Sequence, residues 1–258
     1  MDTTVQILAV ATALADLLRP IPKVAVAFSG GVDSSYLLYA AKACGVDVHA
    51  YYVSSQFQPQ FELEDAKRLA AELGVEMTVL AVDALASETV RANPADRCYH
   101  CKRVVFGEIL RAAGADGYTV LMDGSNASDD AGDRPGMKAL AELEVLSPLR
   151  AAGLTKAEVR EHSREAGLFT WDKPAYACLA TRIPTLTPLD NNTLSRVEQS
   201  EGKLAQMGFT DFRVRVMGRT AKLQLPAEQL TTAAMRHAEL VEALSPWFSD
   251  VLLDLRPR

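Results

Sequence analysis

The sequence predicts an α/β protein that has a doubly wound parallel sheet and a smaller C-terminal α+β domain. Short apolar runs alternate with helical patterns from residue 23 to residue 166, which is typical of strands covered by helices on both faces. After residue 166 a proline-rich segment separates this pattern from a different order of helices and short strands. We therefore place the first domain at 1–170 and the second at 171–258.

The elements of the first domain follow from these apolar runs and from the helical spacing between them. The predicted strands cover 23–28, 48–53, 76–82 and 118–124. The predicted helices cover 33–44, 60–73, a stretch that ends at Val90, 98–113 and 155–166. Ligands of such sheets bind at the carboxyl ends of the strands, so the residues that follow each strand are the first candidates for function.

The second domain begins with a loop-rich segment that contains Pro174, Pro184 and Pro188. The patterns that follow predict a helix at 191–207, strands at 212–217 and 221–226, a helix at 227–243 and a last strand at 250–255. These elements predict a small α+β domain with its own sheet.

Composition and charge favour a cytoplasmic enzyme with a small-molecule substrate. The chain has 258 residues, 48% of them hydrophobic, and a formal net charge of −6, whereas proteins that grip nucleic acid usually carry a basic domain or stripe. Neither a signal peptide nor a membrane-spanning stretch is evident. In the cytoplasm the four cysteines should be reduced, so their grouping favours a metal or catalytic role over a disulfide framework.

The strongest local motif is Ser29-Gly30-Gly31-Val32-Asp33-Ser34, between a predicted strand and a predicted helix. Two glycines let the backbone turn tightly around an anion, and the start of the helix offers unpaired N–H groups. The motif lacks the lysine of a Walker loop and resembles the SGGxDS motif of the PP-loop ATP pyrophosphatases, which form adenylated intermediates. An ordinary glycine turn with a helix cap is the simpler alternative.

This first resemblance implies roles for the residues of the loop. Asp33 would help to hold Mg²⁺, and the phosphates of ATP would contact Ser29, Gly30, Gly31, Ser34 and Ser35. We expect the adenine near the end of the second strand, around Tyr52 to Ser55 and including Ser54. Packing of Tyr51 and Tyr52 within the sheet is an equally good interpretation of those tyrosines.

Three cysteines form the second group of candidates. Cys98 and Cys101 lie three residues apart at the start of a predicted helix, so they share one face, and nearby Arg97, Lys102 and Arg103 favour thiolates. One such pair is shared by redox, zinc and iron–sulfur sites. Cys178 lies in a proline-flanked segment with basic residues at both ends, a setting in which thiols become reactive. We interpret Cys44, at a helix end, as a packing residue.

Beyond these motifs, nearly the whole chain resembles the LarE family of sulfur transferases, which make the pincer ligand of a nickel cofactor. The segments that carry the resemblance lie at 29–35, 93–102, 123–136, 145–150, 173–184 and 212–218. The resemblance implies an ATP-dependent reaction on pyridinium-3,5-biscarboxylic acid mononucleotide, in which each carboxylate is adenylated and then attacked by sulfur. That order is chemically sound, because a carboxylate becomes an electrophile only when one oxygen is made a leaving group.

The resemblance also implies roles for individual residues. Cys178 is the position that bears the sulfur, and single-cysteine members of the family give up that sulfur atom. This chain is instead similar to the three-cysteine branch, in which Cys98, Cys101 and Cys178 would hold a 4Fe-4S cluster. Both routes stay open at this point. The family also implies a homo-oligomer.

The expected substrate pocket lies in the second domain. Arg213 and Arg215 alternate along one strand and so share a face, where they can bind a phosphate or a carboxylate. The resemblance places Arg182 and Glu198 near the same pocket. The segment after the fourth strand supplies Asn126, Asp129 and Asp130 as candidates for nucleotide or metal contacts, and Asn126 is assigned to ATP.

Three other functions compete with this one. A tRNA-thiolating PP-loop enzyme would share the adenylation chemistry but should carry a basic surface or an added RNA module, and neither is evident. A module that only binds nucleotide gives no reason for three cysteines. An amidotransferase-type synthetase would use ammonia and leave Cys178 without a role.

Overall fold

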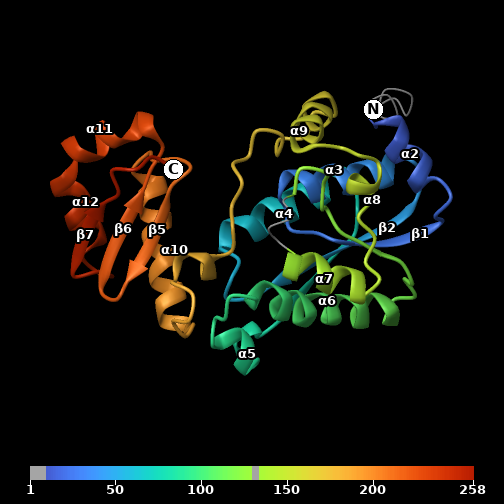
Figure 1. Ribbon diagram of the computed structural model, residues 1–258. Helices are drawn as coiled ribbons and strands as arrows, with labels where there is room; N and C mark the ends of the chain where they lie inside the picture. The colour runs from blue at the N-terminus through green and yellow to red at the C-terminus, as the bar shows by residue number, and fades with distance from the viewer. Residues whose placement is uncertain (1–9, 130–133) are drawn as a thin grey trace. The chain divides into compact units, whose positions relative to one another are not determined.

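The computed structural model describes residues 10–129 and 134–258 (Figure 1), and the chain forms two compact units. The first unit comprises Met1–Ala84 and Asp96–Lys173, and the second comprises Leu85–Ala95 and Pro174–Arg258. Each unit has its own sheet. No helix in the described part of the chain is long and apolar enough to cross a membrane.

The sheet of the first unit has the order β3-β2-β1-β4, and all of its pairs are parallel. Its strands are β1 (Lys23–Ala27), β2 (Asp47–Ser54), β3 (Met77–Ala81) and β4 (Leu121–Met122). The chain moves outward from β1 to β3 and then returns to the other side of β1. The reversal between β1 and β4 is the point at which sheets of this class bind their ligands.

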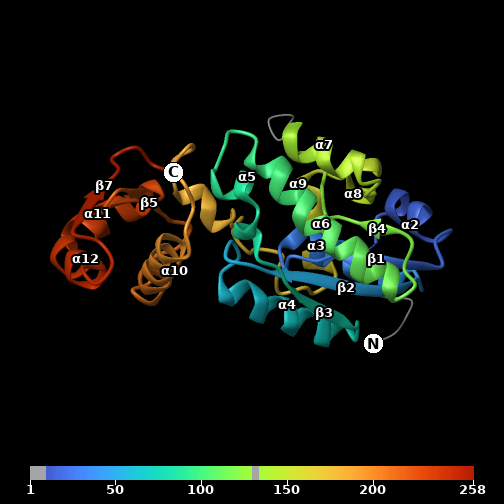
Figure 2. The same ribbon diagram turned by 90° about the horizontal axis from the view of Figure 1, so that it is seen from below.

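Helices cover both faces of this sheet (Figures 1 and 2). One face packs against α2 (Thr12–Leu18), α3 (Val32–Ala43), α4 (Gln60–Leu73), α8 (Pro148–Ala151) and α9 (Lys156–Glu165). The other face packs against α6 (Arg97–Ala115) and α7 (Arg134–Glu142). The strands alternate between the two cores: Val24 and Val26 face the first, and Ala25 faces the second. The predicted doubly wound α/β fold is confirmed.

Several elements of the first unit differ from the sequence prediction. The strand expected at 118–124 is reduced to Leu121–Met122, and beyond its carboxyl end Gly124 approaches α3. The expected helical stretch through Val90 is a 3-10 turn (Ala84–Ala86) and a short helix, α5 (Glu88–Arg91). Helices α2, α7 and α8 were not predicted; α7 begins with Arg-Pro-Gly, and a proline in the first turn does not prevent a helix.

The second unit has a three-stranded sheet of order β5-β6-β7, formed by β5 (Arg213–Met217), β6 (Thr220–Gln224) and β7 (Asp250–Leu253). β5 and β6 form an antiparallel hairpin, and β7 pairs parallel to β6. Helix α10 (Asn191–Gln206) contacts β5. The helix predicted at 227–243 is two helices, α11 (Ala227–Met235) and α12 (His237–Leu244), because Arg236 is not helical and donates to the Met207 carbonyl at 2.8 Å.

The segment Leu85–Ala95 belongs to the second unit although it lies between two parts of the first unit in the sequence. Asn93 holds it there: its Nδ2 donates to the carbonyls of Pro184 at 2.9 Å and Thr187 at 3.1 Å. The Asn93 carbonyl in turn accepts from the Leu186 N–H at 2.8 Å. Asn93 has a positive φ of 54°, which asparagine tolerates better than most residues.

Gly107 lies in the interior of α6, where alanine is the more favourable residue. A Cβ added there would meet no atom within 4 Å, so alanine would fit without strain. We expect Gly107→Ala to raise the free energy of unfolding by about 0.5–1 kcal/mol, since glycine in a helix interior costs that much relative to alanine. Urea unfolding monitored by circular dichroism measures this change, and a loss of stability would contradict the described environment.

Candidate nucleotide and substrate sites

The glycine loop joins β1 to α3 at the predicted position. Gly31 is the N-cap of α3, and no side chain caps the first turn of that helix. Asp33 and Ser34 lie within this turn. The uncapped N–H groups and the positive end of the α3 dipole can therefore receive the phosphates of a nucleotide.

Two close backbone approaches shape the loop, and each requires a glycine. Gly30 has a φ of 72°, and a Cβ there would lie 3.1 Å from the Glu62 carbonyl oxygen of α4. Gly124, which follows β4, is tighter, since its Cβ would lie 2.7 Å from the backbone nitrogen of Ser34. The end of β4 and the first turn of α3 are thus in direct contact.

Hydroxyl groups hold the loop in shape. Ser34 Oγ accepts from the Ser29 N–H at 3.2 Å and donates to the Gly31 carbonyl at 3.2 Å. The hydroxyls of Ser29 and Ser34 also lie 3.1 Å apart. Ser35 is fully buried, and its hydroxyl has no hydrogen-bond partner within the described residues.

Asp33 lies at the centre of a polar group that connects three segments. Asn126 Nδ2 donates to Asp33 Oδ1 at 3.1 Å, and Lys156 Nζ forms an ion pair with Asp33 Oδ2. Asn126 is fully buried and is itself fixed by Asp129, whose carboxylate accepts from the Asn126 N–H at 2.8 Å. Asp130 lies outside the described residues.

A cavity of about 240 Å³ opens beside this group. Its lining includes Ser29, Asp33, Ser34, Asp123 and Asp129. Mg²⁺ commonly binds proteins through one or two carboxylates while the substrate phosphates supply other ligands, and Asp33 beside a phosphate loop fits that pattern. In the described parts of both units, no group of three or more His, Cys, Asp or Glu residues could hold a metal ion by itself.

The region expected to hold adenine is the end of β2. Tyr51 and Tyr52 are buried on opposite faces of the sheet, each within a hydrophobic core. Tyr51 donates to Asp116 Oδ2 at 2.6 Å, and burial raises the pKa of both phenols. The packing interpretation of these tyrosines is therefore confirmed, while the role of Ser54 stays a prediction.

Helix α6 presents the cysteine pair in its first turns. Cys98 is exposed and Cys101 half-buried. Arg97 Nη2 lies 3.8 Å from the Cys98 sulfur. Arg103, by contrast, contacts the Tyr99 hydroxyl at 3.0 Å and Glu142 at 3.8 Å, so it is engaged with α7. Cys44 packs against the core at the end of α3, as predicted.

In the second unit, Cys178 begins a 3-10 turn (Leu179–Arg182) and is half-buried. Its carbonyl accepts from the Thr181 N–H at 2.9 Å. The Arg182 side chain folds back onto the start of this turn. Its Nη1 donates to the Ala177 carbonyl at 2.8 Å and contacts the Cys178 carbonyl at 3.4 Å. The backbone that carries the Cys178 sulfur is thus fixed by a buried guanidinium.

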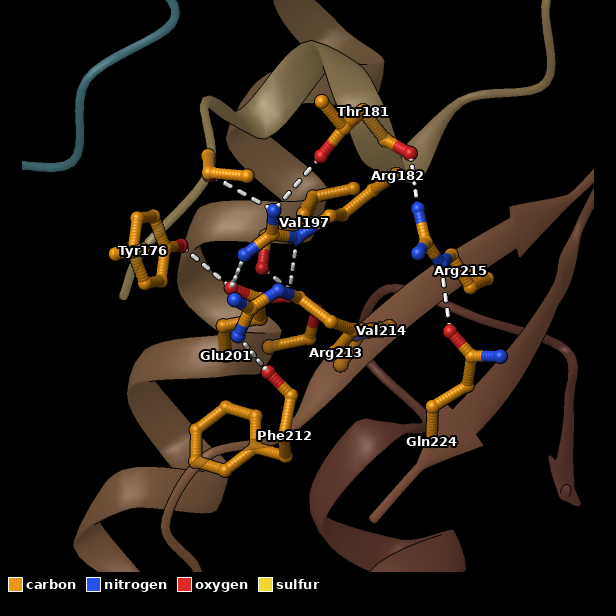
Figure 3. Close-up of polar contacts among 12 residues, drawn as sticks. Tyr176, Thr181, Arg182, Val197, Glu201, Phe212, Arg213, Val214, Arg215 and Gln224 are labelled. Atoms are coloured by element: carbon orange, nitrogen blue, oxygen red, sulfur yellow. Dashed lines mark hydrogen bonds and ion pairs between the residues drawn. The ribbon is translucent and has the colours of Figure 1, made fainter. Parts of the chain in front are cut away.

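Glu201 on α10 is the partner of that guanidinium. Its two carboxylate oxygens accept from Arg182 Nε at 2.8 Å and Arg182 Nη2 at 3.0 Å. Glu201 also accepts from the Val214 N–H at 2.9 Å and from the Tyr176 hydroxyl. One buried carboxylate therefore joins α10, β5 and the segment that carries Cys178 (Figure 3).

Arg213 and Arg215 both reach the 174–182 segment from β5, and their predicted role in binding a phosphate or a carboxylate stays a prediction. Arg213 donates to the Ala175 carbonyl at 2.7 Å, and Arg215 donates to the Thr181 carbonyl. Burial and the nearby Arg182 guanidinium lower the pKa of both groups, to about 10 for Arg213. A cavity of about 230 Å³ is lined by Arg182, Arg215 and Lys222. Arg182 is paired with Glu201 and Lys222 with Asp254 at 3.0 Å, so only part of this positive charge is available to an anionic ligand.

The chain is similar in sequence to one protein family and to several individual proteins. The family described as queuosine biosynthesis protein QueC matches residues 23–97, which include the glycine loop. An uncharacterized protein of Synechocystis sp. is 36% identical over 207 residues, 80% of this chain and 77% of that protein. An uncharacterized protein of Methanocaldococcus jannaschii is 24% identical over 234 residues, 90% of this chain and 89% of that protein.

A protein with an assigned activity decides the family. The pyridinium-3,5-bisthiocarboxylic acid mononucleotide synthase of Lactiplantibacillus plantarum is 32% identical over 215 residues, 83% of this chain and 78% of that enzyme. The chain belongs to the LarE family. It is accordingly an ATP-using sulfur transferase with a PP-loop domain, and the family predicted from the sequence is confirmed.

Two residues of this LarE-family chain form ion pairs in the candidate sites and were not predicted from the sequence. Glu201 holds the Cys178 segment, whereas the acidic residue predicted there was Glu198, which is half-buried on the same helix. Lys156 pairs with Asp33 across 123 positions. Both contacts join residues that are far apart in the sequence, so no local motif predicts them. Glu201 does occupy a position of α10 at which the helical pattern predicts an apolar residue, and this could have indicated a buried carboxylate.

Proposed function

We propose that this enzyme adenylates the carboxylates of pyridinium-3,5-biscarboxylic acid mononucleotide and converts them to thiocarboxylates for a nickel-pincer cofactor. The family relation carries the proposal, since it spans 83% of the chain. A phosphate loop with an uncapped helix start and a second, arginine-rich cavity suit a reaction between ATP and an anionic substrate.

In the first step a substrate carboxylate oxygen attacks the α-phosphorus of ATP, and pyrophosphate leaves. The glycine loop and the start of α3 would hold the departing phosphates through Ser29, Ser34 and backbone N–H groups. Mg²⁺, held by Asp33, supplies positive charge to those phosphates when it is bound. Arg213 and Arg215 would hold the phosphate of the substrate, so that its carboxylates are oriented for attack.

In the second step a sulfur nucleophile attacks the acyl carbon, the bond to the adenylate oxygen breaks, and AMP leaves. When Cys178 supplies the sulfur, its thiolate forms a thioester with the acyl carbon, and a base then removes the Cα proton so that the Cβ–Sγ bond breaks. The thiocarboxylate leaves and dehydroalanine remains at position 178, on a backbone fixed by Arg182. We further propose that Cys98, Cys101 and Cys178 together hold a 4Fe-4S cluster. Two of these thiols lie in the first unit and one in the second, so the cluster requires that they meet in the working enzyme.

We propose that the first domain binds ATP and that the second binds substrate and mediates sulfur transfer and assembly into a homo-oligomer. A net charge of −6 supports a small nucleotide substrate over a nucleic acid, and reduced cysteines suit the cytoplasm.

The test is an anaerobic assay of protein reconstituted with iron and sulfide. With ATP, Mg²⁺ and the dicarboxylate mononucleotide, we expect pyrophosphate release and a product in which sulfur replaces a carboxylate oxygen. Intact mass separates the two sulfur sources: loss of one sulfur atom per transfer supports sacrifice of Cys178, and repeated turnover at constant mass supports the cluster. Pyrophosphate release with tRNA but not with this substrate would contradict the proposal.

Cysteine variants test the division between the two steps. We expect Cys178→Ser to keep substrate-dependent pyrophosphate release but to form no thiocarboxylate, because adenylation does not use the thiol. Cys44→Ser, a packing cysteine of the first unit, is the control and should still form product. Thiocarboxylate formation by Cys178→Ser would exclude that sulfur as the nucleophile.

A further inference from the structure

Lys173 reaches the glycine loop from 143 positions away in the sequence. Its Nζ donates to the Gly30 carbonyl at 3.3 Å and forms an ion pair with Asp65 of α4 at 2.7 Å. The Lys173 side chain is 14% exposed, whereas lysine side chains usually keep their ammonium group in water. The two oxygen acceptors therefore replace part of the water that this ammonium group gives up on burial.

The backbone of Lys173 is also held in place. The Lys173 N–H donates to the Thr170 carbonyl at 3.1 Å. Arg160 of α9 donates through Nη2 to the Lys173 carbonyl at 2.7 Å and through Nη1 to the Trp171 carbonyl at 2.6 Å. The position of the ammonium group beside Gly30 is therefore set by the fold of the first unit.

The contact with Lys173 fixes the direction in which the peptide between Gly30 and Gly31 faces. This peptide is trans, so its C=O and its N–H point in opposite directions. Neither residue has a side chain to restrain it, and Gly30 has a φ of 72°, so the backbone can rotate here at little cost. Because Lys173 holds the carbonyl, the Gly31 N–H is turned away from Lys173 and toward Ser29 Oγ, which lies 3.4 Å away.

The Gly31 N–H is available to a ligand. Its 3.4 Å contact with Ser29 is longer than an ordinary N–H···O hydrogen bond, so a phosphate oxygen can replace the hydroxyl. Ser29 lines the cavity of about 240 Å³ beside the start of α3. Rotation of the peptide would instead bring the Gly30 carbonyl oxygen to this side, and its partial negative charge would repel a phosphate.

We propose that Lys173 is a positioning residue for phosphate binding. It holds the Gly30 carbonyl away from the cavity and thereby keeps the Gly31 N–H directed at the phosphates that leave as pyrophosphate. Asp65 in turn holds the Lys173 ammonium group, which does not itself contact the nucleotide. The inference rests on the part of the proposed function that places these phosphates at the glycine loop, and it is independent of the carboxylate that is adenylated.

Lys173→Met tests this role, because it keeps the length of the side chain and removes its donors. Calorimetry measures the binding of pyrophosphate with Mg²⁺ and, separately, the binding of AMP, which lacks the phosphates that leave. We expect the Kd for pyrophosphate to rise about tenfold, as for loss of one hydrogen bond to a charged group, and the Kd for AMP to change less than about twofold. A general loosening of the first unit would weaken the binding of both ligands.

Asp65→Asn separates positioning from charge. It removes a negative charge near the phosphates, so electrostatic attraction alone predicts tighter binding of pyrophosphate. Loss of the anchor for Lys173 predicts weaker binding instead, by about two- to threefold, with AMP binding unchanged. Lys67→Met is the control: it removes an exposed lysine of α4 that pairs with Glu64 at 3.6 Å, and it should leave the binding of both ligands unchanged.

Unchanged pyrophosphate binding by a folded Lys173→Met protein overturns the proposal, and so does an equal loss of AMP binding. Tighter pyrophosphate binding by Asp65→Asn overturns it as well, and this milder variant decides the question if Lys173→Met does not fold. None of these measurements includes a substrate carboxylate, so their outcome is independent of whether the enzyme forms a thiocarboxylate.

Discussion

Replacing Glu201 by alanine should lower the free energy of unfolding of the second unit by about 3–5 kcal/mol, the usual cost of removing one partner of a buried ion pair. The Arg182 side chain is fully buried, and it would lose both of its contacts with the Glu201 carboxylate. The Val214 N–H and the Tyr176 hydroxyl would lose their acceptor as well. Urea unfolding of the whole chain, monitored by tryptophan fluorescence, measures the effect, since Trp247 lies in this unit.

Glu198→Ala is the matched control, since it removes a half-buried carboxylate from the same helix. We expect a stability change below about 1 kcal/mol, because this carboxylate is half-buried and that of Glu201 is buried. A similar loss for both variants would contradict the special role of Glu201. Glu201→Gln should fall between them, because the amide keeps one acceptor oxygen but lacks the charge that Arg182 requires.

Gly124→Ala should disable the nucleotide site. The added Cβ would lie 2.7 Å from the Ser34 nitrogen and 3.0 Å from its Cα, and backbone atoms cannot rotate away as a side chain can. The first turn of α3 must therefore move. We expect a loss of about 1–3 kcal/mol in stability from overpacking, and about a hundredfold loss in the rate of pyrophosphate release from the displaced phosphate contacts.

Nucleotide binding by calorimetry and pyrophosphate release together check this expectation. Gly107→Ala is the control, because it adds the same methyl group to open space in α6 and should retain activity. Normal ATP binding by a folded Gly124→Ala protein would show that the contact between β4 and α3 does not position the loop.

The parts that the sequence predicts well are those in which local pattern and fold agree. The apolar run at 23–28 leads into two glycines and a helix with Asp33 in its first turn, and no distant residue is needed to form this unit. The pair Cys98 and Cys101 likewise lies in the first turns of α6, as their spacing predicts. Alternation along β5 also places Arg213 and Arg215 against the same segment.

The parts that were missed depend on contacts between residues far apart in the chain. Glu201 is 19 positions from Arg182, and Lys156 is 123 positions from Asp33, so neither pair leaves a local pattern. The strand expected at 118–124 differs for a related reason: β4 ends at Met122, and Gly124 then approaches the first turn of α3. Contacts between distant residues therefore determine both the end of β4 and the ion pairs of the candidate sites.

The assignment of Leu85–Ala95 to the second unit has a topological consequence. The chain passes from one unit to the other three times, after Ala84, Ala95 and Lys173, so a single cut at any one of these junctions leaves the two bodies covalently joined. Cys98 follows Ala95 by only three positions, which limits the separation of their Cα atoms to about 11 Å. The start of α6, which carries Cys98 and Cys101, therefore follows closely in the chain on a segment of the unit that contains Cys178.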